Sequence, residues 1–144
     1  MKRENYFIKV AQETAALSKD PKTKVGAIIV KDNKILSIGY NGAPHGFPDE
    51  TIPQGHSTSN LLEDKNTFMV HAELNAILNY TGHMTDLKSA TVYCTLCPCT
   101  ECIKALIQVG IERIIYLKDY HSDIVTASYF LCTMANVKLE RWES

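Results

Sequence analysis

Two short segments of the sequence bring together residue types that bind metal ions. They are His-Ala-Glu at 71–73 and Pro-Cys-Thr-Glu-Cys at 98–102. Imidazole nitrogen and thiolate sulfur are the ligands that zinc prefers in proteins. We therefore predict that His71, Cys99 and Cys102 are the ligands of one zinc ion per chain.

The spacing of the two cysteines places both in the first turn of a predicted helix. Cys99 and Cys102 are three residues apart, so their side chains would share one face of that turn. Pro98 suits a helix start, where its missing N–H loses no hydrogen bond, and the helix dipole favours ionised thiols. His71 is expected at a second helix start, because the apolar residues that follow it recur at helical spacing.

Glu73 has the chemistry of a proton carrier. Three protein ligands leave one tetrahedral position of zinc open to water, which is typical of catalytic rather than structural sites. Zinc lowers the pKa of such a water to about 7. Glu73 is two residues from His71, poorly placed to bind the same ion but close enough to move protons beside it. We predict that Glu73 is the catalytic residue.

The other cysteines allow different interpretations of this region. Cys94 and Cys97 precede the ligand pair closely enough that four thiolates would form a closed structural zinc site. That arrangement is disfavoured because one residue separates the pairs and Cys94 falls in a strand-like run. A disulfide framework is disfavoured because five cysteines is an odd number and no secretory signal is recognisable. We expect Cys94, Cys97 and Cys132 to be small buried residues.

Length and composition predict one globular domain spanning residues 1–144. The chain is 45% hydrophobic and 22% charged, with a formal net charge of −1. Without a basic excess we expect no nucleic-acid partner, whereas a small anionic substrate stays open. No apolar run approaches the ~18 residues of a membrane span, so we expect no membrane association. The free cysteines and the missing signal predict a cytoplasmic location.

Apolar patterns predict a helix, a hairpin and then alternating helices and strands. The predicted helices cover 5–18, 71–81, 99–109 and about 122–135, and the predicted strands cover 25–30, 35–40, 90–95, 112–118 and 137–140. The inward-facing residues expected in the first helix are Tyr6, Phe7, Val10, Ala11, Thr14 and Leu17. Gly82 and Gly110 are expected to end the second and third helices. This order predicts an α/β fold, a three-layer α/β/α sandwich on a five-stranded mixed sheet.

The segment from 41 to about 66 differs from the rest of the chain. It is rich in Gly, Pro, His, Ser, Thr and Asn and has no sustained periodicity. A loop this long inside a compact domain is usually functional or disordered. We interpret it as a lid, a regulatory segment or an oligomer contact.

With these residues identified, the chain resembles the cytidine/deoxycytidylate deaminase superfamily over nearly its whole length. His-x-Glu followed by Pro-Cys-x-x-Cys is the known signature of zinc-dependent nucleobase deaminases. Within the superfamily the sequence is most similar to the deoxycytidylate (dCMP) deaminases. The segments that carry this narrower resemblance are Ser-Lys-Asp-Pro at 18–21, Val-Gly-Ala at 25–27, Gly-Tyr-Asn-Gly-Ala-Pro at 39–44, Leu-Asn-Ala-Ile at 74–77 and Asp-Tyr-His at 119–121.

The resemblance implies zinc-dependent hydrolysis of dCMP to dUMP and ammonia, supplying dUMP for thymidylate synthesis. In that reaction activated water attacks the amine-bearing ring carbon, and Glu73 moves protons to the ring nitrogen and the leaving amine. It further implies that Asn41 binds the sugar hydroxyl, the Ala72 N–H binds the pyrimidine carbonyl, and Tyr120 packs near the nucleotide. The candidates for binding the dianionic 5′-phosphate are Ser18, Lys19 and Lys24.

Members of the family are typically homo-oligomers, often hexamers, and many are activated by dCTP and inhibited by dTTP. The resemblance therefore implies the same for this chain, with the 41–66 segment contributing to an effector site whose residues stay unassigned. Mg²⁺ would accompany a triphosphate effector. Some phage relatives bind a second zinc ion in this region, but the segment here has His45 and His56 and no cysteine. We expect one zinc ion per chain.

Two other functions remain open from the sequence. A deaminase acting on tRNA adenosine or free cytidine would carry the same metal motif, because pocket shape and flanking contacts set the substrate. A non-catalytic, zinc-stabilised nucleotide-binding protein would also keep the fold, although it would have no use for Glu73.

Overall fold

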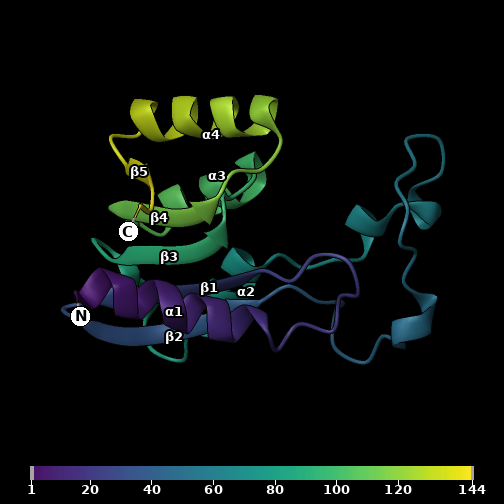
Figure 1. The fold of residues 1–144 in the computed structure, drawn as a ribbon, viewed down its shortest axis with the longest axis horizontal. Helices are drawn as coiled ribbons and strands as arrows, with labels where there is room; N and C mark the ends of the chain where they lie inside the picture. Colours follow the sequence, from purple (N-terminus) through teal and green to yellow (C-terminus); the bar gives the residue numbers. More distant parts are fainter. Residues whose placement is uncertain (1, 144) are drawn as a thin grey trace.

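The computed structural model describes residues 2–143, which form three layers (Figure 1). A five-stranded sheet packs against helix α1 on one face and against helices α2, α3 and α4 on the other. In chain order the helices and strands are α1 (Arg3–Ala15), β1 (Gly26–Lys31), β2 (Lys34–Tyr40), α2 (Ala72–Leu78), β3 (Thr91–Leu96), α3 (Thr100–Gln108), β4 (Arg113–Lys118), α4 (Ser122–Met134) and β5 (Lys138–Arg141). The predicted α/β/α sandwich is confirmed. Among residues 2–143, no helix is long and apolar enough to cross a membrane.

The sheet is mixed, with strand order β2-β1-β3-β4-β5. Strand β1 is antiparallel to both neighbours, while β3, β4 and β5 are parallel. The turn between β1 and β2 has positive φ at Asp32 (53°) and Asn33 (63°), as a two-residue type I′ hairpin requires. Strands β3 and β4 are parallel, so the segments that follow them leave the sheet at the same end of the strands. Folds of the α/β class commonly bind ligands at the carboxyl ends of their strands.

Strand β1 buries side chains on both of its faces. Ile28 and Val30 pack in the cluster that contains helix α1, whereas Ala27 and Ile29 pack in the larger cluster with α2, α3 and α4. This is the pattern expected of a strand covered by helices on both sides.

Helix α1 differs from the prediction in its end and in its buried face. It ends at Ala15 rather than at Ser18. Ile8 is buried, whereas Tyr6 and Leu17 are 50% and 57% exposed, so the prediction that these two face inward is wrong. Leu17 lies beyond the last helical turn, where helical spacing no longer decides which side chains are buried.

Helix α2 is shorter than predicted. It ends at Leu78, and Gly82 does not cap it, because Asn79 is the C-cap residue. The Asn79 side-chain amide donates a hydrogen bond to the Ile38 carbonyl and so joins the end of α2 to strand β2 (3.0 Å).

Helix α3 begins one residue later than predicted. Cys99 is its N-cap residue and Thr100 its first helical residue, so Pro98 precedes the helix instead of opening its first turn. Gly110, with a φ of 88°, follows the end of the helix as predicted.

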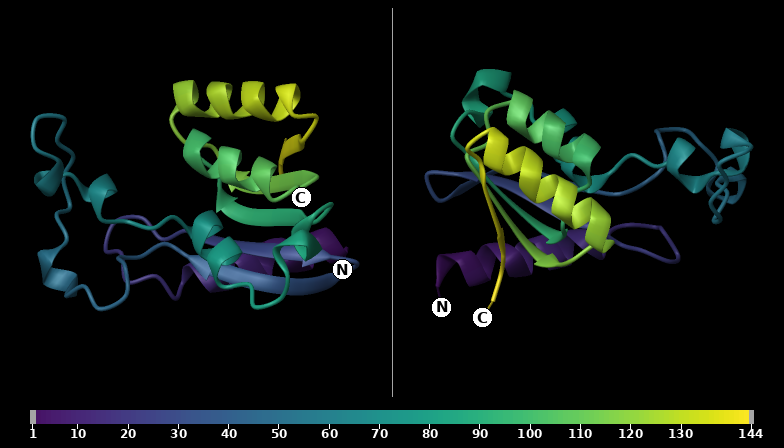
Figure 2. Two further views of the ribbon diagram at one scale, coloured as in Figure 1. Left: turned by 180° about the vertical axis from the view of Figure 1, so that it is seen from behind. Right: turned by 90° about the horizontal axis from the view of Figure 1, so that it is seen from above.

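The segment between β2 and α2 projects away from the sheet, as both views in Figure 2 show. We call residues 43–64 the arm. It contains short 3₁₀ helices at Asp49–Thr51 and Leu61–Glu63, and no residue of the arm is buried. Backbone hydrogen bonds between Gly42 and Val70 close its base (3.1 and 2.7 Å). The arm therefore adds nothing to the core, and its two ends meet at the Gly42–Val70 bridge.

Candidate active site

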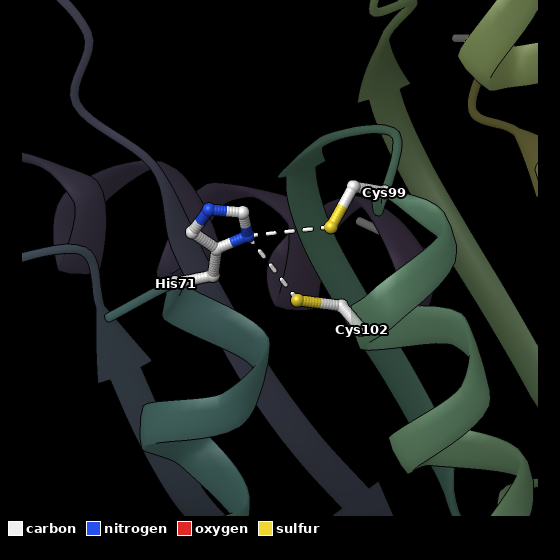
Figure 3. A group of neighbouring side chains, drawn as sticks. All are labelled: His71, Cys99 and Cys102. Atoms are coloured by element: carbon white, nitrogen blue, oxygen red, sulfur yellow. Dashed lines mark hydrogen bonds between the residues drawn. The ribbon is translucent and has the colours of Figure 1, made fainter. Parts of the chain in front are cut away.

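The three predicted metal ligands come together where helices α2 and α3 begin (Figure 3). His71 is the N-cap residue of α2, Cys99 is the N-cap residue of α3, and Cys102 lies in the first turn of α3. The Nδ1 atom of His71 is 3.4 Å from the Sγ atom of Cys99 and 3.4 Å from that of Cys102. All ligand atoms of the group lie within 4.8 Å of one another.

These distances fit a tetrahedral zinc ion. Zinc bonds of about 2.3 Å to sulfur and about 2.0 Å to nitrogen put the two ligand atoms about 3.5 Å apart at the tetrahedral angle. Hydrogen bonds from the Cys102 thiol and from the His71 imidazole lower the pKa of Cys99 to about 4. The Cys99 thiol is therefore readily ionised. The group is thus suited in spacing and chemistry to one zinc ion with a fourth position open.

Glu73 lies beside this group and is almost completely buried. It is 4% exposed and belongs to the first turn of α2. Burial raises the pKa of its carboxyl above the ordinary value. A carboxyl with a raised pKa next to a metal site exchanges protons near neutral pH more readily than an exposed one.

The remaining cysteines are buried and lie outside the metal group. Cys94, Cys97 and Cys132 are 0%, 1% and 1% exposed, as expected for small apolar side chains. Burial raises the pKa of Cys97 to about 12 and that of Cys132 to about 11, so both remain thiols. All five cysteines are free. The structure therefore favours the His/Cys/Cys group over both a four-cysteine site and a disulfide framework.

Packing of α2 directly on strand β2 positions His71 and Glu73. Gly39 has no side chain, and a Cβ atom there would overlap the backbone of Ala72 and Ala76. Ser37 donates a hydrogen bond from its hydroxyl to the Ala76 carbonyl (2.6 Å). The start of α2 is thus fixed by its close contact with the edge strand.

Two hydrogen bonds fix the segment that carries Cys99. The buried hydroxyl of Ser128 on α4 donates to the Pro98 carbonyl (2.8 Å), and the Cys97 N–H donates to the Lys118 carbonyl (2.8 Å). These bonds connect the Cys99 segment to α4 and to the end of β4.

A pocket opens onto Glu73 and the metal group. Asn41, Ala72 and Tyr120 line it, together with His71 and Cys99. Ala72 is the first residue of α2, so its N–H has no acceptor within the helix. The structure therefore brings three of the predicted substrate-binding residues to the metal group.

The Asn41 side chain is already hydrogen-bonded to the protein. Its Oδ1 accepts from the Val25 N–H (2.8 Å), and its Nδ2 donates to the Thr23 carbonyl (2.8 Å) and to Asp20 (3.4 Å). An amide oxygen has two lone pairs. The Val25 N–H therefore occupies one of the two lone pairs of Oδ1.

The three predicted phosphate residues do not line this pocket. Ser18 is 2% exposed, and its hydroxyl donates to the Asn41 carbonyl (2.9 Å), which joins two loops of the site. Lys19 is highly exposed, and its Nζ atom lies 3.9 Å from Oδ2 of Asp49 in the arm. Lys24 is exposed on another part of the surface, near Lys118.

Lys65 and Asp20, which were not predicted from the sequence, line the pocket as a buried ion pair. His56 of the arm lines it as well. Lys65 lies where the arm returns to the body, a position that no sequence spacing reveals. Asp20 belongs to the Ser-Lys-Asp-Pro segment, and that segment is the sequence feature from which Asp20 could have been predicted as a site residue.

Comparison with known proteins identifies the family of the chain. Residues 1–118 match the model of the cytidine and deoxycytidylate deaminase zinc-binding region. The chain belongs to the cytidine and deoxycytidylate deaminase family. The family's zinc-binding character and the His71/Cys99/Cys102 group agree on Zn²⁺ as the metal.

Several members of this deaminase family are similar to the chain over most of its length. Human deoxycytidylate deaminase is 45% identical over 140 residues, which cover 95% of this chain and 78% of the human protein. Deoxycytidylate deaminase of enterobacteria phage T2 is 34% identical, covering 77% of this chain and 75% of the phage protein. The crystal structure of dCMP deaminase from cyanophage S-TIM5 with dCMP and dUMP is 27% identical, with a TM-score of 0.77 and 99% of each chain covered. The predicted superfamily and its fold are confirmed.

Proposed function

We propose that this protein catalyses the hydrolytic deamination of dCMP to dUMP and ammonia. The observation that carries the proposal is the buried Glu73 beside the His71/Cys99/Cys102 group at one pocket. The 45% identity to human deoxycytidylate deaminase and the likeness to the dCMP-bound cyanophage enzyme support dCMP as the substrate.

The site residues have different roles in the reaction. Zinc held by His71, Cys99 and Cys102 would supply the Lewis acidity that activates a water molecule. Glu73 takes a proton from that water, delivers one to the ring nitrogen and assists the departure of the amine as ammonia. Because Glu73 is shielded from solvent, its proton goes to the substrate rather than to bulk water.

The remaining pocket residues orient the nucleotide. The Ala72 N–H, which has no partner within the helix, donates to the pyrimidine carbonyl. Asn41 accepts from the sugar hydroxyl through the second lone pair of Oδ1. Tyr120 packs against the nucleotide from the loop after β4.

The substrate is tested by ammonia release from dCMP, deoxycytidine, cytidine and adenosine-containing tRNA. We expect dCMP to have the highest kcat/KM by at least about tenfold. Faster turnover of the tRNA or of a free nucleoside would contradict the proposal in favour of another deaminase. Absence of turnover by the zinc-loaded protein on every substrate would favour a non-catalytic nucleotide-binding protein.

We also propose that dCTP activates and dTTP inhibits the enzyme, with Mg²⁺ bound to the triphosphate, and that its dUMP supplies thymidylate synthesis. The resemblance to the dCMP deaminases supports this, and the arm is the segment that we assign to effector control. Initial rates with and without each triphosphate and Mg²⁺ test it. Rates that do not change with either nucleotide would contradict it.

We further propose a cytoplasmic homo-oligomer, with a hexamer favoured, built from one domain of residues 1–144. Support comes from apolar side chains that the arm exposes, which a neighbouring subunit would cover: Phe47, Leu61 and Leu62. The five free cysteines support a reducing compartment. Light scattering in solution tests the assembly, and a monomer at all concentrations would contradict it.

A further inference from the structure

One lysine lines the pocket, within the part of the chain that the structure describes. It is Lys65, and the acidic residues that line the same pocket are Asp20 and Glu73. A nucleoside monophosphate carries a dianionic phosphate, which needs a cation or several N–H donors. Lys65 is therefore the permanent positive charge available to a substrate phosphate in this pocket.

Lys65 is buried and held by Asp20. Its side chain is 11% exposed, and its ammonium donates to both carboxylate oxygens of Asp20 (2.8 and 2.7 Å). A buried ammonium group needs an anionic partner, because leaving it unpaired is strongly destabilising. Asp20 occupies at most two of the three ammonium hydrogens, so the third is available to a second anion.

Asp20 is fixed independently of Lys65. Its Oδ1 accepts from the backbone N–H groups of Lys22 (2.8 Å) and Thr23 (3.1 Å), and its Oδ2 accepts from Asn41 (3.4 Å). Asp20 therefore keeps three donors when the Lys65 ammonium shares its hydrogens with another acceptor. The carboxylate serves as a rigid support that holds the ammonium in the pocket.

We propose that Lys65 is the specificity-determining residue by which the enzyme selects a nucleoside monophosphate over the nucleoside. Its ammonium donates to the 5′-phosphate while Asp20 holds it in place. This inference rests on the proposed function and assigns to Lys65 the role that sequence reasoning gave to residues outside the pocket. A hydrogen bond to a charged group changes binding by about 10- to 150-fold, so we expect an effect of about 100-fold.

The test is the selectivity of Lys65→Met, a change that removes the ammonium group and keeps an unbranched side chain of nearly the same length. The quantity measured is the ratio of kcat/KM for dCMP to kcat/KM for deoxycytidine. We expect the ratio to fall about 100-fold in Lys65→Met and to be largely restored in Lys65→Arg. An equal loss on both substrates would show a purely structural role and overturn the inference.

Lys22→Met is the matched control. Lys22 is a lysine near the same loop whose ammonium donates to the Gln54 carbonyl of the arm (2.9 Å), but it does not line the pocket. We expect the selectivity ratio of Lys22→Met to equal that of the unmodified enzyme. A drop as large as in Lys65→Met would assign the effect to the arm and overturn the inference.

Product binding gives a second measurement if Lys65→Met turns over too slowly. The inhibition constants of dUMP and deoxyuridine are compared, and we expect the preference for dUMP to fall by the same factor of about 100. If the unmodified enzyme deaminates neither dCMP nor any other substrate, the proposed function fails. If it deaminates dCMP but Lys65→Met keeps the full preference, only the assignment of Lys65 fails.

Discussion

His71 and Glu73 are two residues apart and have different roles because a helix begins between them. His71 is the N-cap residue with an extended backbone (φ −73°, ψ 155°), so its imidazole points to the cysteines of α3. Glu73 lies within the first helical turn and is buried beside the metal group. The helix start thus separates the proposed metal ligand from the proposed proton carrier.

Cys99→Ser is expected to lose zinc and to lower the melting temperature. The ligands connect the starts of α2 and α3, so loss of one of them weakens both metal binding and the contact between the helices. Zinc per chain by atomic emission and thermal unfolding measure the effect. Cys132→Ser is the control, because Cys132 is buried on α4 outside the group and should keep one zinc ion. A Cys99→Ser protein with full metal content would contradict the assignment.

The sequence was sufficient to predict the His/Cys/Cys group that the structure brings together, and insufficient to predict the residue that we propose for the phosphate. Cys99 and Cys102 are local in sequence, and only one histidine precedes them with a glutamate at the right spacing. Lys65 meets Asp20 only because the arm returns to the body. Ser18 looked like a phosphate ligand, but its hydroxyl is used to join two loops.

At the scale of elements, strand β2 determines where the start of α2 lies. The two backbones approach closely at Gly39, and the hydroxyl of Ser37 binds the helix. The Asn75 and Asn79 amides donate to the Tyr40 (2.8 Å) and Ile38 (3.0 Å) carbonyls of the strand. A shift of α2 along the strand would move His71 and Glu73 away from α3. The edge strand is therefore part of the support of the metal site.

Gly39→Ala is expected to reduce both stability and zinc affinity. The added methyl group would overlap backbone atoms of α2, which move only with the whole helix, and overpacking of this kind costs about 1–3 kcal/mol. Urea unfolding and zinc competition with a chelator measure the two effects. Gly42→Ala is the control, because a Cβ atom at Gly42 meets nothing within 4 Å. Equal behaviour of the two variants would contradict the role of β2.

Element types were more predictable than element ends. The sheet and its helices follow from apolar periodicity, which depends on many residues at once. The end of α2 was missed because it depends on one tertiary contact, the Asn79 amide on the Ile38 carbonyl of β2. The 3₁₀ turns of the arm were missed because no residue there is buried, so no periodicity marks them.

At the scale of the whole molecule, the Asp20–Lys65 pair joins the residue that follows the arm to the loop after α1. Burial alone would raise the pKa of Asp20, but hydrogen bonds from Lys65 and from the Lys22 and Thr23 backbone outweigh it and lower the pKa. A lowered pKa means that ionised Asp20 stabilises the fold above its unfolded pKa of about 3.9. That contribution is lost as the pH falls through the lower folded value.

Asp20→Asn is expected to reduce the free energy of unfolding at pH 7 by about 3–5 kcal/mol, because it leaves Lys65 buried without its anion. The difference from the unmodified protein should be constant above about pH 5 and should shrink as the pH falls toward 3. Urea unfolding of both proteins across this range measures it, and comparison of the two removes contributions from the metal ligands. A difference that does not change with pH would contradict the assignment of the charge pair.

Glu73→Gln separates proton transfer from metal binding when zinc content and dCMP turnover are measured on the same protein. The substitution removes the proton carrier and leaves all three metal ligands in place. We expect one bound zinc ion per chain, an unchanged fold and a loss of turnover of about 100- to 10,000-fold. Turnover within a few fold of the unmodified enzyme, with zinc still bound, would contradict the role of Glu73 as the proton carrier.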